Sequence, residues 1–229
     1  MKKCCALLLI VSCLLLSAVP VRAAGTLHAA YLAGFPDGTI RPEAPVTRAQ
    51  LAVILVRLAE AIPEQAAAEL PDVQLGHWAY GAAALVCRMG LMDTRQDGRF
   101  DPDGPVTGPE LARTLTRLAG DEAAGAVWPS LRAGWEAQEI SFAAGSGWVM
   151  GFDGERFDAD RALSRAELAV ILNGLLGRTP SSLDDLQLGM PVFEDNRDAQ
   201  AWYFLPVQEA AVTHTASLTG AHERWTGLG

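Results

Sequence analysis

One phrase of sequence occurs three times in this chain, at intervals of about 60 residues. Each copy joins an Asp-Gly turn to an apolar residue, a Thr or Ser, and a leucine-rich stretch. The turns lie at Asp37, Asp97 and Asp153, and the hydroxyl residues are Thr47, Thr107 and Ser164. A period of this length is typical of a repeated supersecondary unit that shares a core with its neighbours. We therefore expect an array of units, with function located at the joints between them.

Each copy carries the signature of a capped helix. A Gln or Glu follows each hydroxyl residue after three positions, at Gln50, Glu110 and Glu167. In such a capping box the hydroxyl accepts from the third helical amide, and the longer side chain returns to the N–H of the cap residue. Apolar residues then recur at the helical period, which predicts a buried face. Three helices are expected to begin with the same device.

A second helix in each unit is expected to begin near a tryptophan. Trp78 and Trp135 open Ala-rich stretches that end at Gly90 and Gly147, and Trp202 opens a third near the C-terminus. The first Asp-Gly unit has no such helix before it, and the segment at Trp202 has no capped helix after it. These half units are complementary, so we predict that the C-terminal helix packs beside the first unit and closes a three-unit ring.

The N-terminus has the order of a secretory signal peptide, with Lys2 and Lys3 before an apolar run and small residues up to Ala23. Cleavage there would change the formal charge from −9 to about −12 and leave Cys87 as the single thiol. Lipidation at Cys13 is an alternative. The expected location is therefore outside the cell.

We expect a mostly helical fold in one module over residues 24–229, after a signal peptide at 1–23. Alternating Thr and Ser residues before Gly220 predict a small hairpin in the tail. The expected parts are a first half unit with linker (24–70), a second unit (71–120), a third unit (128–178), a closing half unit (190–212) and the tail hairpin (213–229).

The composition argues against several classes of function. An acidic chain without a Lys/Arg cluster lacks the charge pattern of a nucleic-acid binder. The acidic segment before Glu110 lacks the Asp-x-Asp-x-Asp-Gly order of a calcium loop. No ligand spacing relates the histidines to one another or to Cys87, so we expect no metal or cofactor and read them as surface or capping residues. The histidines are His28, His77, His214 and His222.

The assembled motifs resemble the S-layer homology (SLH) domain family over about residues 30–211. The motifs are Phe35-Pro36-Asp37-Gly38-Thr39, Val46-Thr47-Arg48-Ala49-Gln50, Pro71-Asp72-Val73, His77-Trp78-Ala79 and Ser164-Arg165-Ala166-Glu167. The resemblance implies a pseudo-threefold trimer of helix-loop-helix units around a central three-helix bundle. It also implies non-covalent anchoring to pyruvylated secondary polymers of a bacterial cell wall, without a membrane span in the mature chain.

The resemblance further implies ligand-binding grooves between units. Their members would be Arg48 and Arg165, Gly34 and Gly151, Trp78, Trp135 and Trp202, and Asp72 and Asp195. An arginine fork can hold the pyruvate carboxylate with two parallel bonds, and tryptophan offers a flat face to a sugar ring. The tryptophans are equally compatible with core anchors at helix starts.

The second unit departs from the family pattern, because Gly108-Pro109 replaces Arg-Ala. One groove is therefore expected not to bind polymer, unless Arg95 or Arg99 substitutes for the missing arginine.

The expected function is a non-catalytic module that binds wall polymer or serves as a structural component of the envelope. The repeated Asp and Glu already have turn and cap roles, and neither a nucleophile elbow nor a phosphate loop occurs, so we expect no enzyme. Two alternatives remain. One is a degenerate module that binds a surface protein partner, and the other is a wall-active glycan hydrolase.

Overall fold

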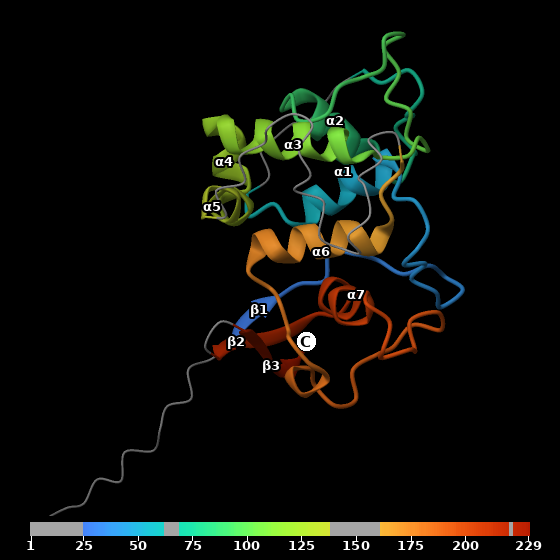
Figure 1. Cartoon of the computed structure of the whole chain (residues 1–229). Coiled ribbons are helices and arrows are strands. Elements are labelled where there is room, and N and C mark those ends of the chain that lie inside the picture. Colours follow the sequence, from blue (N-terminus) through green and yellow to red (C-terminus); the bar gives the residue numbers. More distant parts are fainter. Residues whose placement is uncertain (1–24, 62–68, 138–160, 220–221) are drawn as a thin grey trace, which may run out of the picture.

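Helices dominate the part of the chain that the structure describes, which comprises residues 25–61, 69–137, 161–219 and 222–229 of a computed structural model (Figure 1). The predicted signal peptide lies outside these residues. The helices are α1 (Arg48–Arg57), α2 (Tyr80–Arg88), α3 (Gly108–Gly120), α4 (Glu122–Val127), α5 (Pro129–Ala137), α6 (Arg165–Leu176), the short η1 (Leu183–Asp185) and α7 (Phe204–Ala211). The strands are β1 (Thr26–His28), β2 (His214–Thr219) and β3 (His222–Leu228). The prediction of a mostly helical fold with a C-terminal hairpin is confirmed.

The apolar residues that precede α1, α3 and α6 exchange backbone hydrogen bonds in a closed ring. Val46 N–H donates to Leu163 at 2.9 Å, Leu163 N–H donates to Val106 at 2.8 Å, and Val106 N–H donates to Val46 at 3.0 Å. All three side chains are buried. The three repeats therefore meet at one junction, from which their capped helices begin. The wider pseudo-threefold trimer around a central three-helix bundle stays a prediction.

Two of the three predicted capping boxes are confirmed. At α1 the Thr47 hydroxyl accepts from the Gln50 amide, and at α6 the Ser164 hydroxyl accepts from the Glu167 amide, with the reciprocal bond formed in both. The box predicted at Thr107 is wrong, because that side chain caps no amide. The Glu110 carboxylate, which was expected to complete the box, forms an ion pair with Arg48 instead.

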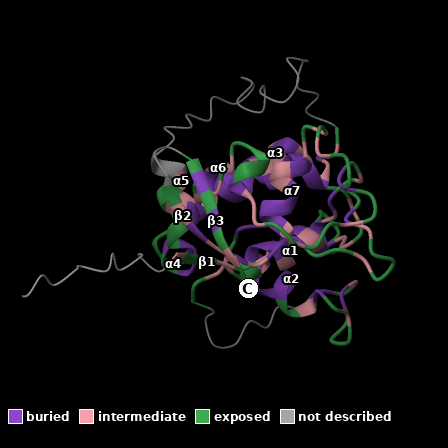
Figure 2. Cartoon of the chain, turned by 90° about the horizontal axis from the view of Figure 1, so that it is seen from below, coloured by how far each residue is buried: buried purple, intermediate pink, exposed green. Residues whose placement is uncertain are grey.

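The leucine-rich faces predicted from the helical period form the core. Leu51 and Leu55 of α1, Leu111 and Leu115 of α3, and Leu168 and Leu172 of α6 are all at most 1% exposed. Figure 2 shows that buried residues are concentrated in the helices. Trp128 fills the space beside α1, where its indole N–H donates to the Leu55 carbonyl at 2.6 Å. Within the described residues, no helix combines the length and the apolar character needed to cross a membrane.

The two ends of the described chain pack together. The amides of Tyr31 and Leu32 both donate to the Ala210 carbonyl at the end of α7, at 3.0 and 2.9 Å. The Tyr31 hydroxyl donates to Asn173 Oδ1 of α6 at 2.6 Å, so this segment is bonded to both helices. The prediction that the C-terminal helix packs beside the N-terminal segment is confirmed.

A small antiparallel sheet joins the same two ends in the order β1-β2-β3 (Figure 1). The hairpin of β2 and β3 was predicted, whereas β1 was not, because three residues carry too short a pattern. His28 of β1 pairs in register with His214 of β2. His214 is fully buried, so the interpretation of this histidine as a surface residue is wrong.

Candidate binding clefts

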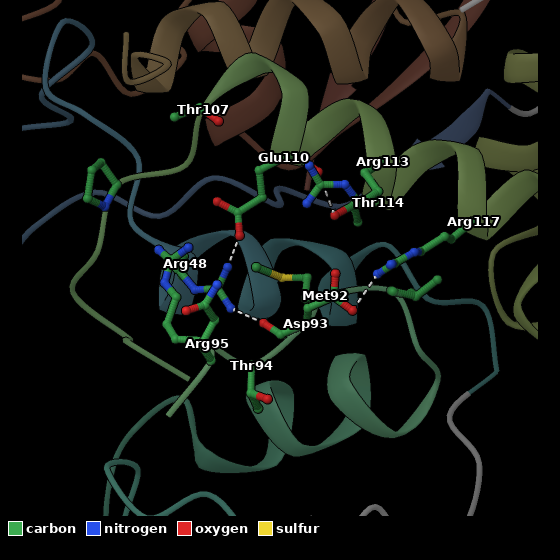
Figure 3. Close-up of a pocket in the computed structure, with 13 residues that line it drawn as sticks. Arg48, Met92, Asp93, Thr94, Arg95, Thr107, Glu110, Arg113, Thr114 and Arg117 are labelled. Carbon is green, nitrogen blue, oxygen red and sulfur yellow. Dashed lines mark hydrogen bonds and ion pairs between the residues drawn. The ribbon is translucent and has the colours of Figure 1, made fainter. Parts of the chain in front are cut away.

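Arg48 is the first residue of α1, and its side chain is buried in the second unit. Its Nε donates to the Phe100 carbonyl at 2.6 Å and its Nη2 to the Asp93 carbonyl at 2.5 Å. The guanidinium carbon lies 4.7 Å from the centroid of the Phe100 ring. Its Nη1 forms the ion pair with Glu110 (Figure 3). Burial lowers the pKa of Arg48, with a further contribution from nearby Arg95.

A cavity of about 530 Å³ opens beside Arg48. Four arginines and two carboxylates take part in its lining, and they come from α1, α3 and the segment between α2 and the junction: Arg48, Arg95, Arg113, Arg117, Asp93 and Glu110. Arg117 pairs with Asp93 at 2.9 Å, as Figure 3 shows, and Arg95 pairs with Asp101 at 2.9 Å. Three of the four arginines thus already hold a carboxylate. Of these lining residues, Asp93, Arg113 and Arg117 were not identified as candidates from the sequence. The four-residue spacing of Arg113 and Arg117 on one helix face was the available signal for the two arginines.

Arg165 repeats the geometry of Arg48 at the start of α6. Its Nε donates to the Ile40 carbonyl at 2.8 Å and its Nη2 to the Ala33 carbonyl at 2.6 Å. The side chain is only 3% exposed, yet no described carboxylate forms an ion pair with it. Burial lowers the pKa of Arg165 to about 10, and the nearby Arg41 adds to this effect. The guanidinium carbons of Arg41 and Arg165 lie 3.8 and 5.0 Å from the Phe35 ring centroid.

Asp72 and Asp195 hold the loops that supply carbonyls to these arginines. Each carboxylate accepts two hydrogen bonds from adjacent backbone amides, and all four lie between 2.7 and 2.8 Å. The donors are Phe100 and Asp101 for Asp72, and Ile40 and Arg41 for Asp195. Asp101 and Arg41 have φ of 61° and 52°, an unusual backbone conformation that the clamp helps to fix. The two predicted acidic residues therefore position the loops.

Of the three tryptophans predicted for the grooves, the two whose side chains the structure describes are on the surface. Trp78 is 64% exposed and Trp202 is 50% exposed, so the core-anchor alternative is wrong for both. Trp135 lies in α5, but its side chain is outside the described residues, and so is the whole of Gly151. Contact with a sugar stays a prediction for all three tryptophans.

Gly34 lies where the C-terminal segment presses against the first loop. A Cβ at this position would lie 2.5 Å from a ring carbon of Phe193 and 3.0 Å from the Thr39 carbonyl oxygen. Close packing between the two chain ends therefore requires glycine here, whatever ligand the cleft binds.

The surroundings of both arginines combine residues of neighbouring repeats. Arg165 of the third repeat joins Gly34 and Asp195 around residues 33–41, and Arg48 of the first repeat joins Asp72 around residues 93–101. A third cleft, expected from Trp135 and Gly151, would involve residues outside those described.

Comparison with known proteins identifies the repeat. The model of the S-layer homology domain matches residues 28–52 and 69–112, which include Arg48, Asp72 and Trp78. The chain is 28% identical over 222 residues to cell surface glycoprotein 1 of Acetivibrio thermocellus, covering 90% of this chain and 9% of that protein. It is also 28% identical over 200 residues to the cellulosome-anchoring protein of the same organism, covering 82% of this chain and 43% of that protein. Residues 28–52 and 69–112 of this chain are thus similar to the S-layer homology domain.

Proposed function

We propose that this chain is a non-catalytic module of the bacterial cell envelope, and that it binds a carboxylate-bearing wall polymer chiefly through the predicted groove at Arg165. The observation that carries the proposal is a buried guanidinium with no described carboxylate partner. Asp195 acts on this guanidinium electrostatically but forms no ion pair with it, so an anionic ligand would supply the direct counter-charge that a buried cation needs. A pyruvylated sugar offers such a carboxylate.

The hydrogen bonds that Arg165 already makes leave the end-on edge of its guanidinium available for a ligand carboxylate. The Ile40 and Ala33 carbonyls occupy Nε and one hydrogen of Nη2. The Nη1 amino group and the second Nη2 hydrogen remain, and together they form the end-on edge that can hold a carboxylate with two parallel bonds. The backbone contacts also fix the orientation of the guanidinium before a ligand arrives, which reduces the entropic cost of binding.

Arg48 makes the same backbone contacts but already has a carboxylate. Glu110 occupies the position that a ligand carboxylate would take on this guanidinium. We therefore expect the Arg48 cleft to bind the polymer more weakly than the Arg165 cleft. Two features are thus expected to weaken polymer binding: Gly108 replaces an arginine, and Glu110 already pairs with Arg48.

Several further observations support anchoring over catalysis. The family match and the relative named as a cellulosome-anchoring protein are consistent with attachment at the cell surface. The carboxylates of Asp72 and Asp195 are engaged by backbone amides and that of Glu110 by Arg48, whereas glycoside hydrolysis needs two available carboxyl groups. Exposed Trp78 and Trp202 offer apolar faces for sugar rings. Several shallow sites on one polymer would gain by multivalency.

The test is co-sedimentation of the purified protein with cell walls. Arg165→Lys keeps the positive charge but removes the planar fork, so we expect the dissociation constant to rise about tenfold or more. Arg48→Lys should change it by much less. Arg197→Lys is the matched control, because Arg197 is 65% exposed and pairs only with its neighbour Glu194 among the described residues.

Circular dichroism of each variant separates loss of binding from loss of folding. Equal sedimentation of the folded Arg165→Lys variant and the wild type would contradict the proposed cleft. Loss of binding to chemically depyruvylated walls would support the pyruvate as the ligand. Unchanged binding to walls stripped of polymer would favour a surface protein partner instead.

A further inference from the structure

Four side chains that could bind a metal ion meet where the two chain ends join. They come from four different elements, β1, α7, β2 and β3, and are His28, Glu209, His214 and Glu223. One ligand atom of each lies within 4.8 Å of those of the others. His214, Glu209 and Glu223 are at most 2% exposed, and the His28 side chain is 15% exposed. This cluster is separate from both arginine clefts.

The imidazole nitrogens face carboxylate oxygens directly. His28 Nδ1 lies 2.9 Å from Glu223 Oε1 and 3.6 Å from Glu209 Oε1. His214 Nε2 lies 3.0 Å from Glu223 Oε1 and 3.2 Å from Glu209 Oε2. A lone pair on nitrogen and a carboxylate repel each other, so each facing nitrogen must carry a proton, or both must share a metal ion with the carboxylates.

The surroundings of His214 resemble the support that metal-binding histidines usually have. Its Nδ1 lies 2.8 Å from the Val212 carbonyl and donates to it, which directs Nε2 toward the carboxylates. The imidazole stacks on the Trp225 ring, with 3.9 Å between centroids. The Trp225 indole N–H donates to Glu209 Oε2 at 2.7 Å and so fixes that carboxylate. Two of the four side chains are therefore held in place by groups outside the cluster.

Two carboxylate oxygens in the cluster lack a hydrogen-bond donor. Glu209 Oε1 and Glu223 Oε2 are buried without a partner, and such orphaned acceptors need an explanation. Protons on the two histidines would serve Glu223 Oε1 and Glu209 Oε2 and would leave both orphans in place. Arg178 acts electrostatically on His28 but forms no ion pair with either carboxylate within the described residues. A divalent cation can bind these oxygens and compensate two negative charges at once.

We propose that His28, Glu209, His214 and Glu223 bind one divalent transition-metal ion, for which zinc is the best fit. Zinc takes four nitrogen or oxygen ligands at about 2.0–2.2 Å, so neighbouring ligand atoms are about 3.3 Å apart in a tetrahedron. Four histidine-to-carboxylate distances in the cluster, which involve both oxygens of Glu209 and Oε1 of Glu223, lie between 2.9 and 3.6 Å, and one ligand atom of each residue lies within 4.8 Å of the others. A bound ion would draw these atoms together by small side-chain movements. Calcium is excluded as the preferred ion because it takes six to eight oxygen ligands.

The site would connect the first and last elements of the fold. His28 comes from β1 and Glu223 from β3, and both also line a cavity of about 170 Å³ beside β2 through which an ion could arrive. A metal bound only by the folded chain stabilises it by mass action. Zinc would thus fasten the closure of the two chain ends, independently of polymer binding.

The test starts from protein treated with a chelator and then titrated with ZnCl₂ in a calorimeter. We expect saturable binding of one zinc ion per chain and no such binding of CaCl₂. The thermal midpoint should rise by about 5–10 °C at a zinc concentration about 100 times the Kd. Substitution of Co²⁺ should produce the strong visible absorption of a tetrahedral site, which tests coordination in the unaltered protein.

Two variants assign the ligands. His28→Gln and Glu223→Gln should each reduce zinc affinity at least tenfold, while exposed His222→Gln on the same strand should have no effect. Absence of saturable zinc binding by the wild type, or binding unchanged in both ligand variants, would overturn the proposal. If a variant fails to fold, the cobalt spectrum of the wild type decides: an absorption typical of octahedral cobalt would equally overturn it.

Discussion

At the scale of single residues, Arg48 and Arg165 show how one neighbouring carboxylate changes what a side chain can bind. Both are first helical residues, both are buried, and both donate through Nε and Nη2 to carbonyls of a neighbouring repeat. Glu110 accompanies only Arg48. The buried cation thus has a direct carboxylate partner at Arg48, whereas at Arg165 Asp195 acts only electrostatically, which leaves room for the proposed ligand. Co-sedimentation of the lysine variants addresses this difference directly.

Asp72 allows a prediction of pH dependence. Burial would raise the pKa of its carboxyl, but the amides of Phe100 and Asp101 outweigh burial and hold that pKa below its usual range. A carboxyl with a lowered pKa in the folded state stabilises the fold fully above its unfolded pKa of about 3.9. This contribution is lost as the pH falls through the folded-state pKa.

Asp72→Asn should therefore lower the free energy of unfolding by about 1–2 kcal/mol at neutral pH. The difference from the wild type should shrink below about pH 4. Urea unfolding at a series of pH values measures both. Asp103→Asn in the same loop is the control, because Asp103 is exposed. A difference for Asp72→Asn that stays constant down to pH 2, about two units below the unfolded pKa, would contradict the role of the ionised carboxylate.

At the scale of elements, the same capping phrase produces two outcomes. Thr47 and Ser164 complete capping boxes with the residue three positions later. At α3 the corresponding Glu110 is within reach of Arg48, and an ion pair with a buried guanidinium competes successfully with a bond to the Thr107 amide. A contact between residues far apart in sequence thus overrides a local rule.

Substitution of each cap by alanine tests this account. Thr47→Ala and Ser164→Ala should each lower the free energy of unfolding by about 1 kcal/mol, because each leaves a helical amide without its acceptor. Thr107→Ala should cost less than about 0.5 kcal/mol, since its hydroxyl caps no amide. The midpoints of urea unfolding at constant slope give the values. An equal decrease in the free energy of unfolding at all three positions would contradict the conclusion that Glu110 pairs with Arg48 in place of the Thr107 amide.

At the scale of the whole molecule, the parts found from sequence are those encoded locally. The capped helices and the tail hairpin depend on spacings within a few residues, and the complementary half units depend on the repeat itself. The ion pair of Glu110 with Arg48 and the meeting of His28 with His214 depend on distances that only the fold creates. No spacing in the sequence relates such residues. The roles of Asp72 and Asp195 as loop clamps were hidden for the same reason.

The joined ends make a prediction for the whole fold. Without residues 179–229, the amides of the buried residues Tyr31 and Leu32 lose the Ala210 carbonyl, and the amides of buried Ile40 and exposed Arg41 lose Asp195. Each unpaired group costs about 1–3 kcal/mol, and together these losses are comparable with the total stability of a domain, about 5–15 kcal/mol. A chain of residues 25–178 should therefore lose its cooperative thermal transition, monitored by circular dichroism. Addition of a separate 179–229 fragment should restore it toward that of the 25–229 chain. If the 25–178 chain instead unfolds cooperatively with the same thermal midpoint as the 25–229 chain, the C-terminal half unit does not complete the first repeat.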